Sequence, residues 1–318
     1  MAKILIIKQG ALGDVVMATA LIRQIQQHHA QDDLWLLTAP PYVEIFNQWP
    51  GLNVVAFERK GLREGLRALA WIRSSGFARV YDLQSSDRSG LLCALSGIRT
   101  RVGNHPRFPY HLHPAGKYTG QCHIYDRMLE VLRAAGIAAV NTPPVLPVTD
   151  ATRNLVISWL RENKLVDKSF VILHPGASPA HPEKRWPCFQ ELALALRDSG
   201  YAVVWAGAGD ERKMNMRFSR QVGIDATGRF NISGLAELGR HARLAITNDS
   251  GPMHVLSCSG IPVFAFFGPT NWRRNHAIGQ AENIIVPGDP SSATFRPAAL
   301  DGITAARVLQ RLREKNLL

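Results

Sequence analysis

The sequence predicts an α/β protein with two doubly wound parallel sheets, one in each half of the chain. Short apolar strands alternate with helical segments over residues 3–135, and the same alternation restarts after residue 150. Between the two halves, residues 141–150 contain three prolines, which is the composition of a linker. We therefore expect two domains, 1–150 and 151–318, with a cleft between them, and we expect chemistry in the loops that follow the strands.

The first half begins with the apolar strand 3–8, followed by a loop and a helix whose apolar positions approximate helical spacing. The other apolar runs and helical patterns continue the alternation. The expected strands are 3–8, 34–38, 54–57 and 80–83, and the expected helices are 14–28, 62–74, 87–95 and 125–135, with a loop or helix starting at Pro40.

The segment 99–125 interrupts this rhythm. No Asp or Glu occurs between Arg88 and Tyr125, and the segment is rich in Arg and His. Connections of this length are uncommon unless they serve a function, so we predict an exposed functional loop. The alternative is a solvated basic loop. A zinc site is disfavoured, because the His spacings fit no closed set of ligands.

The second half repeats the alternation and ends in an amphipathic helix. For that last helix, packing against either domain is open. The expected strands are 170–174, 201–206, 244–248 and 261–267, and the expected helices are 151–163, 189–199, 211–222, 235–241, one that starts at Pro252, and 304–315.

Composition limits the class of protein. A chain of 318 residues with 46% hydrophobic and 19% charged residues can bury the core of two globular domains. No apolar run approaches the roughly 20 residues that span a bilayer, and no signal-peptide pattern precedes the first turn. The four cysteines are scattered, without the spacing of metal ligands. We expect reduced thiols in a cytosolic protein.

The formal net charge of +12 indicates an anionic partner. The excess is +5 over residues 1–150 and +7 over residues 151–318, so it is not a basic tail. Nucleic acid, an anionic membrane surface and an anionic substrate would each fit. The sequence contains no zinc finger, stacked-aromatic motif or basic heptad array, so we expect no nucleic-acid partner.

The first strand-end loop, 9–14, places Asp14 where a strand turns into a helix. It lacks the GxGxxG pattern and its distant acidic residue, which argues against a dinucleotide site. Its carboxylate could act in chemistry. Taken alone, the loop favours the other interpretation, an N-cap or first-turn Asp that the helix dipole stabilises.

Two further strand-end loops lie in the second half. After strand 170–174, a Gly-containing loop leads to Lys184 and Arg185, which could neutralise phosphate oxygens or form a solvated surface pair. After strand 201–206, a Gly-rich turn carries Asp210 and Glu211. These acids could bind ribose hydroxyls, or Asp210 could simply cap the turn.

The stretch 244–269 reads as strand, tight turn, helix and strand. Asn248, Asp249, Ser250 and Gly251 form the turn, and Pro252 opens the helix. The free N–H groups of such a helix end attract anions, so a phosphate-bearing ligand is the first hypothesis. The alternative is that Asp249 or Ser250 caps the helix. We expect His254, one turn further, to be a packed core residue.

Four ordered motifs resemble those of the heptosyltransferases of lipopolysaccharide core assembly, glycosyltransferase family nine. They are ILIIKQGALGDVVMATAL at the start, YDLQ followed by Arg88, HPGAS…KRWP with the Gly-rich acidic turn after it, and TNDSGPMH…GIPVFAFFGPT. The similarity runs nearly end to end. Residues 103–121 depart from it, so the resemblance says least about acceptor recognition.

The resemblance implies a GT-B fold and an inverting glycosyltransferase that uses ADP-heptose, with Asp14 as general base, Lys184 on the diphosphate and no metal. The first domain would bind the acceptor and the second the sugar nucleotide. Donor-binding residues would be Ser178, Lys184, Glu211, Asp249, Ser250, Gly251, Pro252, Met253 and His254. Acceptor-binding residues would be Gly13, Arg88, Arg107 and Lys117.

The implied acceptor is an anionic glycolipid, either lipid A carrying Kdo sugars or an already heptosylated core. We accordingly expect a monomer without a cofactor, peripheral at the cytoplasmic face of the inner membrane of a Gram-negative bacterium. Three alternatives remain open: another sugar nucleotide as donor, a GT-B-like epimerase or hydrolase of sugar nucleotides, and a non-catalytic nucleotide-binding module.

Overall fold

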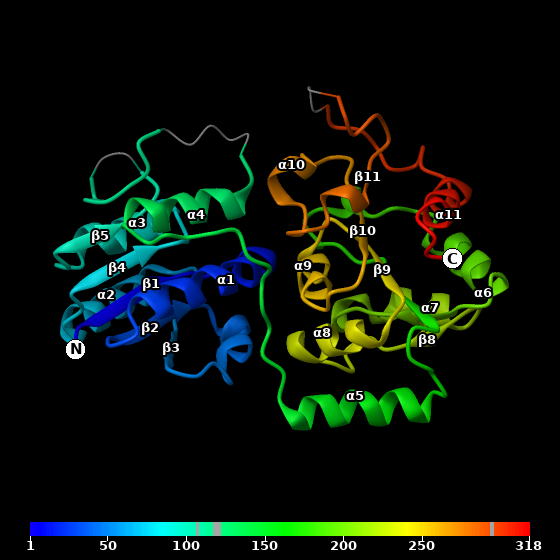
Figure 1. Ribbon diagram of the computed structural model, residues 1–318, viewed down its shortest axis with the longest axis horizontal. Helices are drawn as coiled ribbons and strands as arrows, with labels where there is room; N and C mark the ends of the chain where they lie inside the picture. Colours follow the sequence, from blue (N-terminus) through cyan, green and yellow to red (C-terminus); the bar gives the residue numbers. More distant parts are fainter. Residues whose placement is uncertain (106–107, 117–121, 293–295) are drawn as a thin grey trace. The chain divides into compact units, whose positions relative to one another are not determined.

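The computed structural model describes residues 1–105, 108–116, 122–292 and 296–318. The chain separates into two compact units, Met1–Pro147 and Val148–Leu318, each built on its own sheet (Figure 1).

Unit 1 contains a five-stranded parallel sheet in the order β3-β2-β1-β4-β5. Its strands are β1 (Lys3–Ile7), β2 (Asp33–Thr38), β3 (Leu52–Ala56), β4 (Arg79–Asp82) and β5 (Thr100–Val102). Chain order reverses between β1 and β4, which both pair in the centre of the sheet. Ligands of open α/β sheets bind beyond the carboxyl ends of the strands at such a switch point. In unit 1, that place is formed by the loops that follow β1 and β4.

The helices of unit 1 are α1 (Leu12–His28), α2 (Leu62–Ser75), α3 (Asp87–Leu95) and α4 (Ile124–Ala134), with the 3₁₀ helix η1 at Pro40–Phe46. α2 and α3 cover the same face of the sheet. They bury Ala68, Ile72, Leu92 and Cys93 in one core with Leu5 and Ile7 of β1 and Val80 of β4. α1 packs against α4.

Unit 2 contains a six-stranded parallel sheet in the order β11-β10-β9-β6-β7-β8. Its strands are β6 (Phe170–His174), β7 (Ala202–Trp205), β8 (Ile224–Asp225), β9 (Leu244–Asn248), β10 (Val263–Phe266) and β11 (Ile284–Ile285). Here the order reverses between β6 and β9, so the loops after these two strands form the equivalent switch point.

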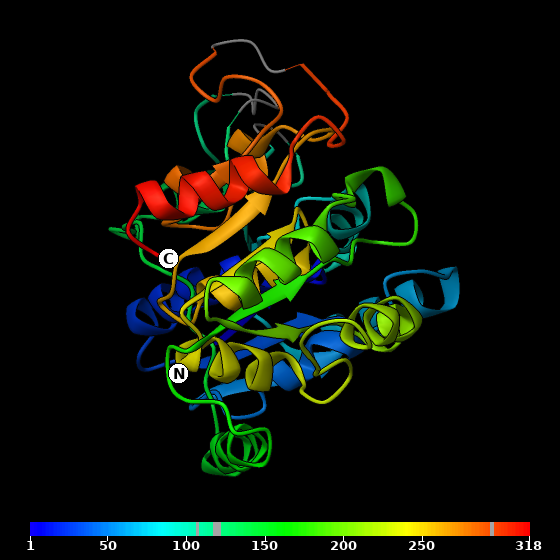
Figure 2. The ribbon, with the colours of Figure 1, turned by 90° about the vertical axis from the view of Figure 1, so that its right-hand side faces the viewer.

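Successive residues of these strands enter two different cores, as the two-residue period of a strand requires. Val171 and Leu173 of β6 pack on the side of α6 (Phe189–Asp198), α7 (Arg212–Ser219) and α11 (Ala305–Glu314). Phe170 and Ile172 pack on the side of α5 (Asp150–Glu162), α8 (Ile232–His241) and α9 (Gly251–Ser257). The last helix, α11, therefore packs within unit 2, beside α6 (Figure 2).

The expected strands and helices occur, with ends that shift by up to three residues. The sequence patterns did not predict the short elements. These are β5, β8, β11, α10 (Trp272–Asn275) and the 3₁₀ helices η2 (Pro182–Lys184), η3 (Gly209–Glu211) and η4 (Ala281–Asn283). The segment 99–125, predicted as an exposed functional loop, contains a strand at its start. β5 lies inside it, Val102 bridges to Leu112, and the Arg101 guanidinium donates to the carbonyls of Ile98 and Pro109. Within the described ranges, no helix has the length and apolar character of a membrane span.

Candidate active site

At the switch point of unit 2, a lysine and a threonine from distant loops share one carboxylate oxygen. The Lys184 ammonium, at the end of η2, donates to Asp249 Oδ2 at 2.7 Å, and the Thr270 hydroxyl donates to the same oxygen at 2.6 Å. Asp249 is buried and Lys184 is mostly buried. These two contacts leave Oδ1 as the second acceptor of the carboxylate. The sequence prediction that Lys184 and Asp249 belong to one site agrees with this geometry.

The last residue of β9, Asn248, holds the two loops of the switch point together. Its side-chain oxygen accepts from the Trp186 N–H at 3.0 Å, and its amide donates to the carbonyls of Pro175 at 2.8 Å and Gly176 at 3.1 Å. Asn248 is fully buried. Because Trp186 lies two residues after Lys184, the hydrogen bonds of Asn248 fix the position of Lys184 relative to the end of β9.

The start of α9 differs from the capping alternative. Ser250 is the N-cap residue, but neither its side chain nor that of Asp249 caps the helix: Ser250 Oγ lies 3.3 Å from the Asn248 carbonyl, and Asp249 binds Lys184. The N–H of Met253, a predicted donor-binding residue, donates to the Ser250 carbonyl at 3.2 Å. Pro252 has no N–H. Of the four residues 250–253, Ser250 and Gly251 therefore keep a backbone N–H that could donate to an anion.

His254, one turn into α9, is buried. This position fits the prediction of a packed residue better than its assignment to donor binding. Ser178, also assigned to the donor, is exposed in the loop after β6.

A buried Glu–His pair lies at the carboxyl ends of β6 and β7. His174 Nε2 is 3.3 Å from Glu211 Oε2, which also accepts from the Ala208 N–H at 2.7 Å. The second ring nitrogen of His174 lies 3.5 Å from Ser250 Oγ. Burial acts to raise the pKa of Glu211, but the hydrogen bond and charge of His174, with the Ala208 N–H, hold that pKa below its usual value. Glu211 is therefore an ionised carboxylate, and it, not Asp210, closes the Gly-rich turn.

Two glycines make room for the Glu211 carboxylate. A Cβ on Gly176 would lie 1.2 Å from Glu211 Oε1, and a Cβ on Gly207 would lie 2.7 Å from Oε2. No side chain other than hydrogen fits at Gly176 while Glu211 keeps its place.

We expect Gly176→Ala to displace the Glu211 carboxylate and to weaken donor binding about tenfold or more, because a buried charged hydrogen-bond network loses its geometry. Calorimetric titration with a nucleoside diphosphate measures this effect. Gly209→Ala is the matched control, because its added Cβ meets nothing within 4 Å. Equal affinity of the two variants would contradict the role of Glu211 in donor binding.

At the switch point of unit 1, Asp14 pairs with a buried lysine. Asp14 lies in the first turn of α1, whose N-cap is Ala11, so it is a first-turn residue and not the cap. Its Oδ2 lies 3.6 Å from the ammonium of Lys8, which also donates to the Leu83 carbonyl at 3.2 Å. The Lys8 side chain is 2% exposed and the Asp14 side chain 29%, so the carboxylate is accessible and its partner is not.

The carboxylate at the end of β4, Asp82, is fully buried and acts electrostatically on Lys8. Asp82 accepts from the N–H groups of Gln84 and Ser85, both at 2.9 Å, and from the Tyr110 hydroxyl. Burial lowers the pKa of Lys8, and the carboxylates of Asp14 and Asp82 oppose this effect. Burial also raises the pKa of Asp82 and of Tyr110. The loop after β1 is therefore underlain by a Lys8–Asp82–Tyr110 network.

The residues predicted to bind the acceptor divide into three cases. Gly13 is buried beside Asp14 in the first turn of α1. The Arg88 guanidinium donates to the carbonyls of Glu58, Arg59 and Gly61, so it supports the loop between β3 and α2. Arg107 and Lys117 lie outside the described residues, and their role stays a prediction.

Sequence reasoning missed three residues that the fold places at these sites. Lys8 directly follows β1, and a lysine at the end of an apolar run was the available signal. Thr270 and His174 stand inside the quoted motifs, but nothing in the sequence pairs them with Asp249 and Glu211. Among the residues that the structure describes, no group of three or more His, Cys, Asp or Glu side chains could hold a metal ion.

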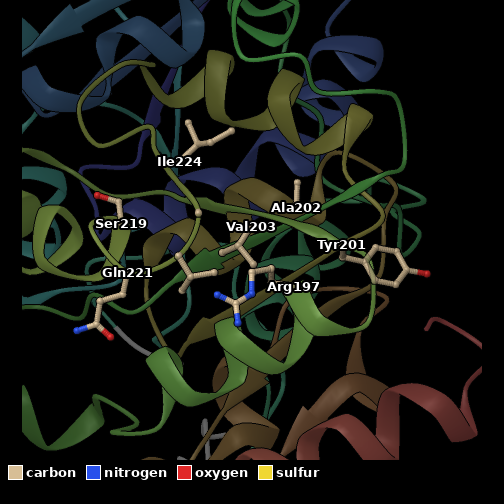
Figure 3. Close-up of a pocket in the computed structure, with 9 residues that line it drawn as sticks. Arg197, Tyr201, Ala202, Val203, Ser219, Gln221 and Ile224 are labelled. Carbon is tan, nitrogen blue, oxygen red and sulfur yellow. The ribbon is translucent and has the colours of Figure 1, made fainter.

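A separate hollow lies at the amino ends of β7 and β8 (Figure 3). It is lined by Arg197, Tyr201, Ser219, Gln221 and the first residues of the two strands. None of the predicted site residues contributes to it. It lies at the end of the sheet opposite to the switch point, where parallel α/β sheets do not bind substrates.

Comparison with known proteins agrees with this architecture. The model of glycosyltransferase family 9 (heptosyltransferase) matches residues 66–300. The chain is 25% identical over 299 residues to lipopolysaccharide heptosyltransferase 2 of Escherichia coli (strain K12), covering 85% of this chain and 83% of that protein.

Solved structures of the family share the fold. The family 9 glycosyl transferase of Veillonella parvula superimposes with a TM-score of 0.83 at 22% identity, covering 99% of this chain and 97% of the other. The E. coli ADP-heptose lps heptosyltransferase II superimposes with a TM-score of 0.75 at 22% identity, covering 98% of each chain. These matches confirm the predicted GT-B fold class. Since the family model spans most of the chain and the fold agrees, the protein belongs to glycosyltransferase family 9, the heptosyltransferase family.

Proposed function

We propose that the protein transfers a heptose from ADP-heptose to the inner core of lipopolysaccharide, either to lipid A carrying Kdo sugars or to a heptosylated core. The observation that carries the proposal is the Lys184–Asp249 pair at the switch point of unit 2. It offers a cation for a diphosphate beside a carboxylate for sugar hydroxyls. The similar E. coli enzyme is named for lipopolysaccharide, and the solved E. coli structure for ADP-heptose.

On the donor side, Lys184 neutralises the diphosphate, and Asp249 Oδ1 accepts from sugar hydroxyls while Oδ2 stays with Thr270. The leaving ADP gains negative charge as its bond to the sugar breaks. An ammonium and backbone N–H groups directed at that charge stabilise the transition state, and the proposal therefore assigns no step to a metal. Glu211, ionised beside His174, accepts from the ribose hydroxyls.

On the acceptor side, Asp14 takes the proton of the acceptor hydroxyl as its oxygen bonds to the anomeric carbon. The bond between that carbon and the diphosphate breaks on the opposite face, so the configuration inverts. A carboxylate suffices as general base, because the hydroxyl loses its proton only as the new bond forms. The buried Lys8 ammonium lies 3.6 Å from Asp14 Oδ2 and orients the carboxylate for this step.

The proposed acceptor also suggests where the protein acts. A glycolipid in the inner membrane would be reached from the cytoplasmic face by a peripheral, monomeric enzyme. The net charge of +12 favours contact with such an anionic surface.

Incubation of the protein with a panel of sugar nucleotides, with and without delipidated core oligosaccharide, tests the proposal. We expect ADP release that requires both ADP-heptose and the oligosaccharide, with the product formed at the inverted anomeric centre. Release from another sugar nucleotide would reassign the donor. Turnover of donor without acceptor would indicate an epimerase or hydrolase, and binding without turnover would indicate a nucleotide-binding module.

A further inference from the structure

We propose that the outer surface of α2 and α3 in unit 1 docks on an anionic lipid bilayer. Four leucines of these two helices are exposed: Leu62 by 82%, Leu66 by 58%, Leu91 by 59% and Leu95 by 44%. They are four of the ten exposed large hydrophobic side chains in the described part of the chain. Scattered exposed leucines are ordinary, but a contiguous apolar surface on a water-soluble fold marks an interaction site.

The four leucines, called here the leucine surface, lie along the seam between the two helices. α2 and α3 run side by side, because Arg73 Nε donates to the Leu95 carbonyl at 2.8 Å and a Cβ on Gly65 would lie 3.5 Å from the Arg88 guanidinium. Arg73 stands seven residues after Leu66 and eleven after Leu62, so all three share one face of α2.

The opposite faces of both helices are used by the core. Ala68 and Ile72 of α2 and Leu92 and Cys93 of α3 are buried on the same side of the sheet. Leu91 and Leu95 are four residues apart and lie on the remaining face of α3, next to the seam. The leucine surface therefore consists of exposed leucines on two neighbouring helices, on sides that the core does not use.

The segment that carries Leu62 and Leu66 is rich in basic residues. Residues 58–73 carry five, Arg59, Lys60, Arg63, Arg67 and Arg73, against two acids, Glu58 and Glu64. Glu64 is paired with Arg67 at 2.6 Å. Arg88 fixes the loop that carries Arg59 and Lys60, because its guanidinium donates to three carbonyls of residues 58–61. On α3, the charges of Asp87 and Arg88 cancel.

This combination fits the boundary of an anionic bilayer. Leucines enter the region between headgroups and acyl chains, while Arg and Lys remain at the level of the phosphates. Each basic residue near such a surface adds electrostatic attraction to the anionic lipids, and salt weakens that attraction. The inference rests on the proposed function in one respect: the glycolipid acceptor gives unit 1 a reason to meet a membrane.

Co-sedimentation with vesicles tests the proposal. We expect the protein to bind vesicles of phosphatidylglycerol mixed equally with phosphatidylcholine, to bind pure phosphatidylcholine weakly, and to be released by high salt. Replacing two leucines, Leu62→Gln with Leu91→Gln, should weaken binding about tenfold or more, since buried apolar area supplies the insertion. Replacing Arg63 and Arg67 with Gln should weaken it about fivefold for each lost charge.

The chain offers a matched control in unit 2. Leu155 and Val166 are exposed by 45% and 68%, so Leu155→Gln with Val166→Gln removes similar apolar surface elsewhere. This control should bind vesicles like the unaltered protein, and all variants should unfold at the same temperature. Equal binding of the leucine variant and the unaltered protein would overturn the proposal. The proposal would also be overturned by equal binding to both vesicle types or by the absence of vesicle binding. A dimer that dissociates only in the leucine variant would overturn it as well.

Transfer to delipidated oligosaccharide separates this inference from the proposed function. The leucine variant should keep its rate on that soluble acceptor and lose rate on acceptor embedded in vesicles. If the unaltered protein transfers nothing to either acceptor but binds vesicles through the leucine surface, the proposed function fails and the docking surface stands.

Discussion

Asp14→Asn is expected to lower the rate of transfer about a thousandfold, in the range that general-base catalysis contributes. The amide cannot accept the proton of the acceptor hydroxyl, yet it keeps the shape of the carboxylate. ADP affinity should stay the same within about twofold, because the donor residues Lys184, Asp249 and Glu211 belong to unit 2. Steady-state kinetics and calorimetric titration with ADP measure the two effects.

The buried neighbour of Asp14 supplies a second test. Lys8→Met removes the buried ammonium that lies 3.6 Å from Asp14 Oδ2, so the carboxylate loses the partner that orients it and transfer should slow. ADP affinity should again be unchanged. Asp14→Asn that retained its turnover would remove Asp14 as the base, and an unchanged transfer rate in Lys8→Met would show that Lys8 serves only the packing of unit 1.

Lys184→Ala should weaken the binding of ADP by about thirtyfold, equivalent to about 2 kcal/mol for a lost charge-assisted contact. The Lys184 ammonium is held 2.7 Å from Asp249, at the switch point where the diphosphate is proposed to bind. Calorimetric titration with ADP alone measures this loss of affinity separately from catalysis. Lys213→Ala is the control, because Lys213 is an exposed lysine of the same unit, on α7.

The partner of Lys184 separates phosphate binding from sugar binding. Asp249→Asn leaves the ammonium without its ionic partner but available to the diphosphate, so ADP should bind at least as well. Transfer should fall, because the proposed sugar contact through Oδ1 is altered. If Lys184→Ala bound ADP as the unaltered protein does, the lysine would be a structural partner of Asp249 and not a phosphate ligand.

Much of the architecture could be predicted from local patterns. Apolar runs such as Phe170–His174 became fully buried strands, and the helix 87–95 was predicted with its observed ends. The short strands β8 and β11 could not be predicted. Each has two residues, too few to show a period, and each forms because a neighbouring strand offers hydrogen bonds.

The structure places Asp14, Lys184, Glu211 and Asp249 near the carboxyl ends of the two sheets, and it brings to them residues that the sequence did not predict. Their position in strand-end loops predicted Asp14, Lys184, Glu211 and Asp249 as site residues, because ligands bind at the carboxyl ends of a parallel sheet. The capping alternative for Ser250 and Asp249 was wrong, since Asp249 is recruited by Lys184 from 65 residues away. Local sequence cannot reveal a contact of that range.

The sequence by itself determined the fold class, the two units and the positions of the strand-end loops. These follow from the spacing of hydrophobic residues and from turn-forming Gly and Pro residues, which are patterns of a few neighbouring residues. The tertiary structure alone decided which groups meet. Strand order places β6 between β7 and β9, so His174 reaches Glu211 in the loop after β7 and Lys184 reaches Asp249 in the loop after β9. It also decided that Lys8 is buried under Asp14, and that Leu62 and Leu91 face outward. Burial and charge pairing are properties of the packed chain, because they depend on which distant segments come to lie side by side.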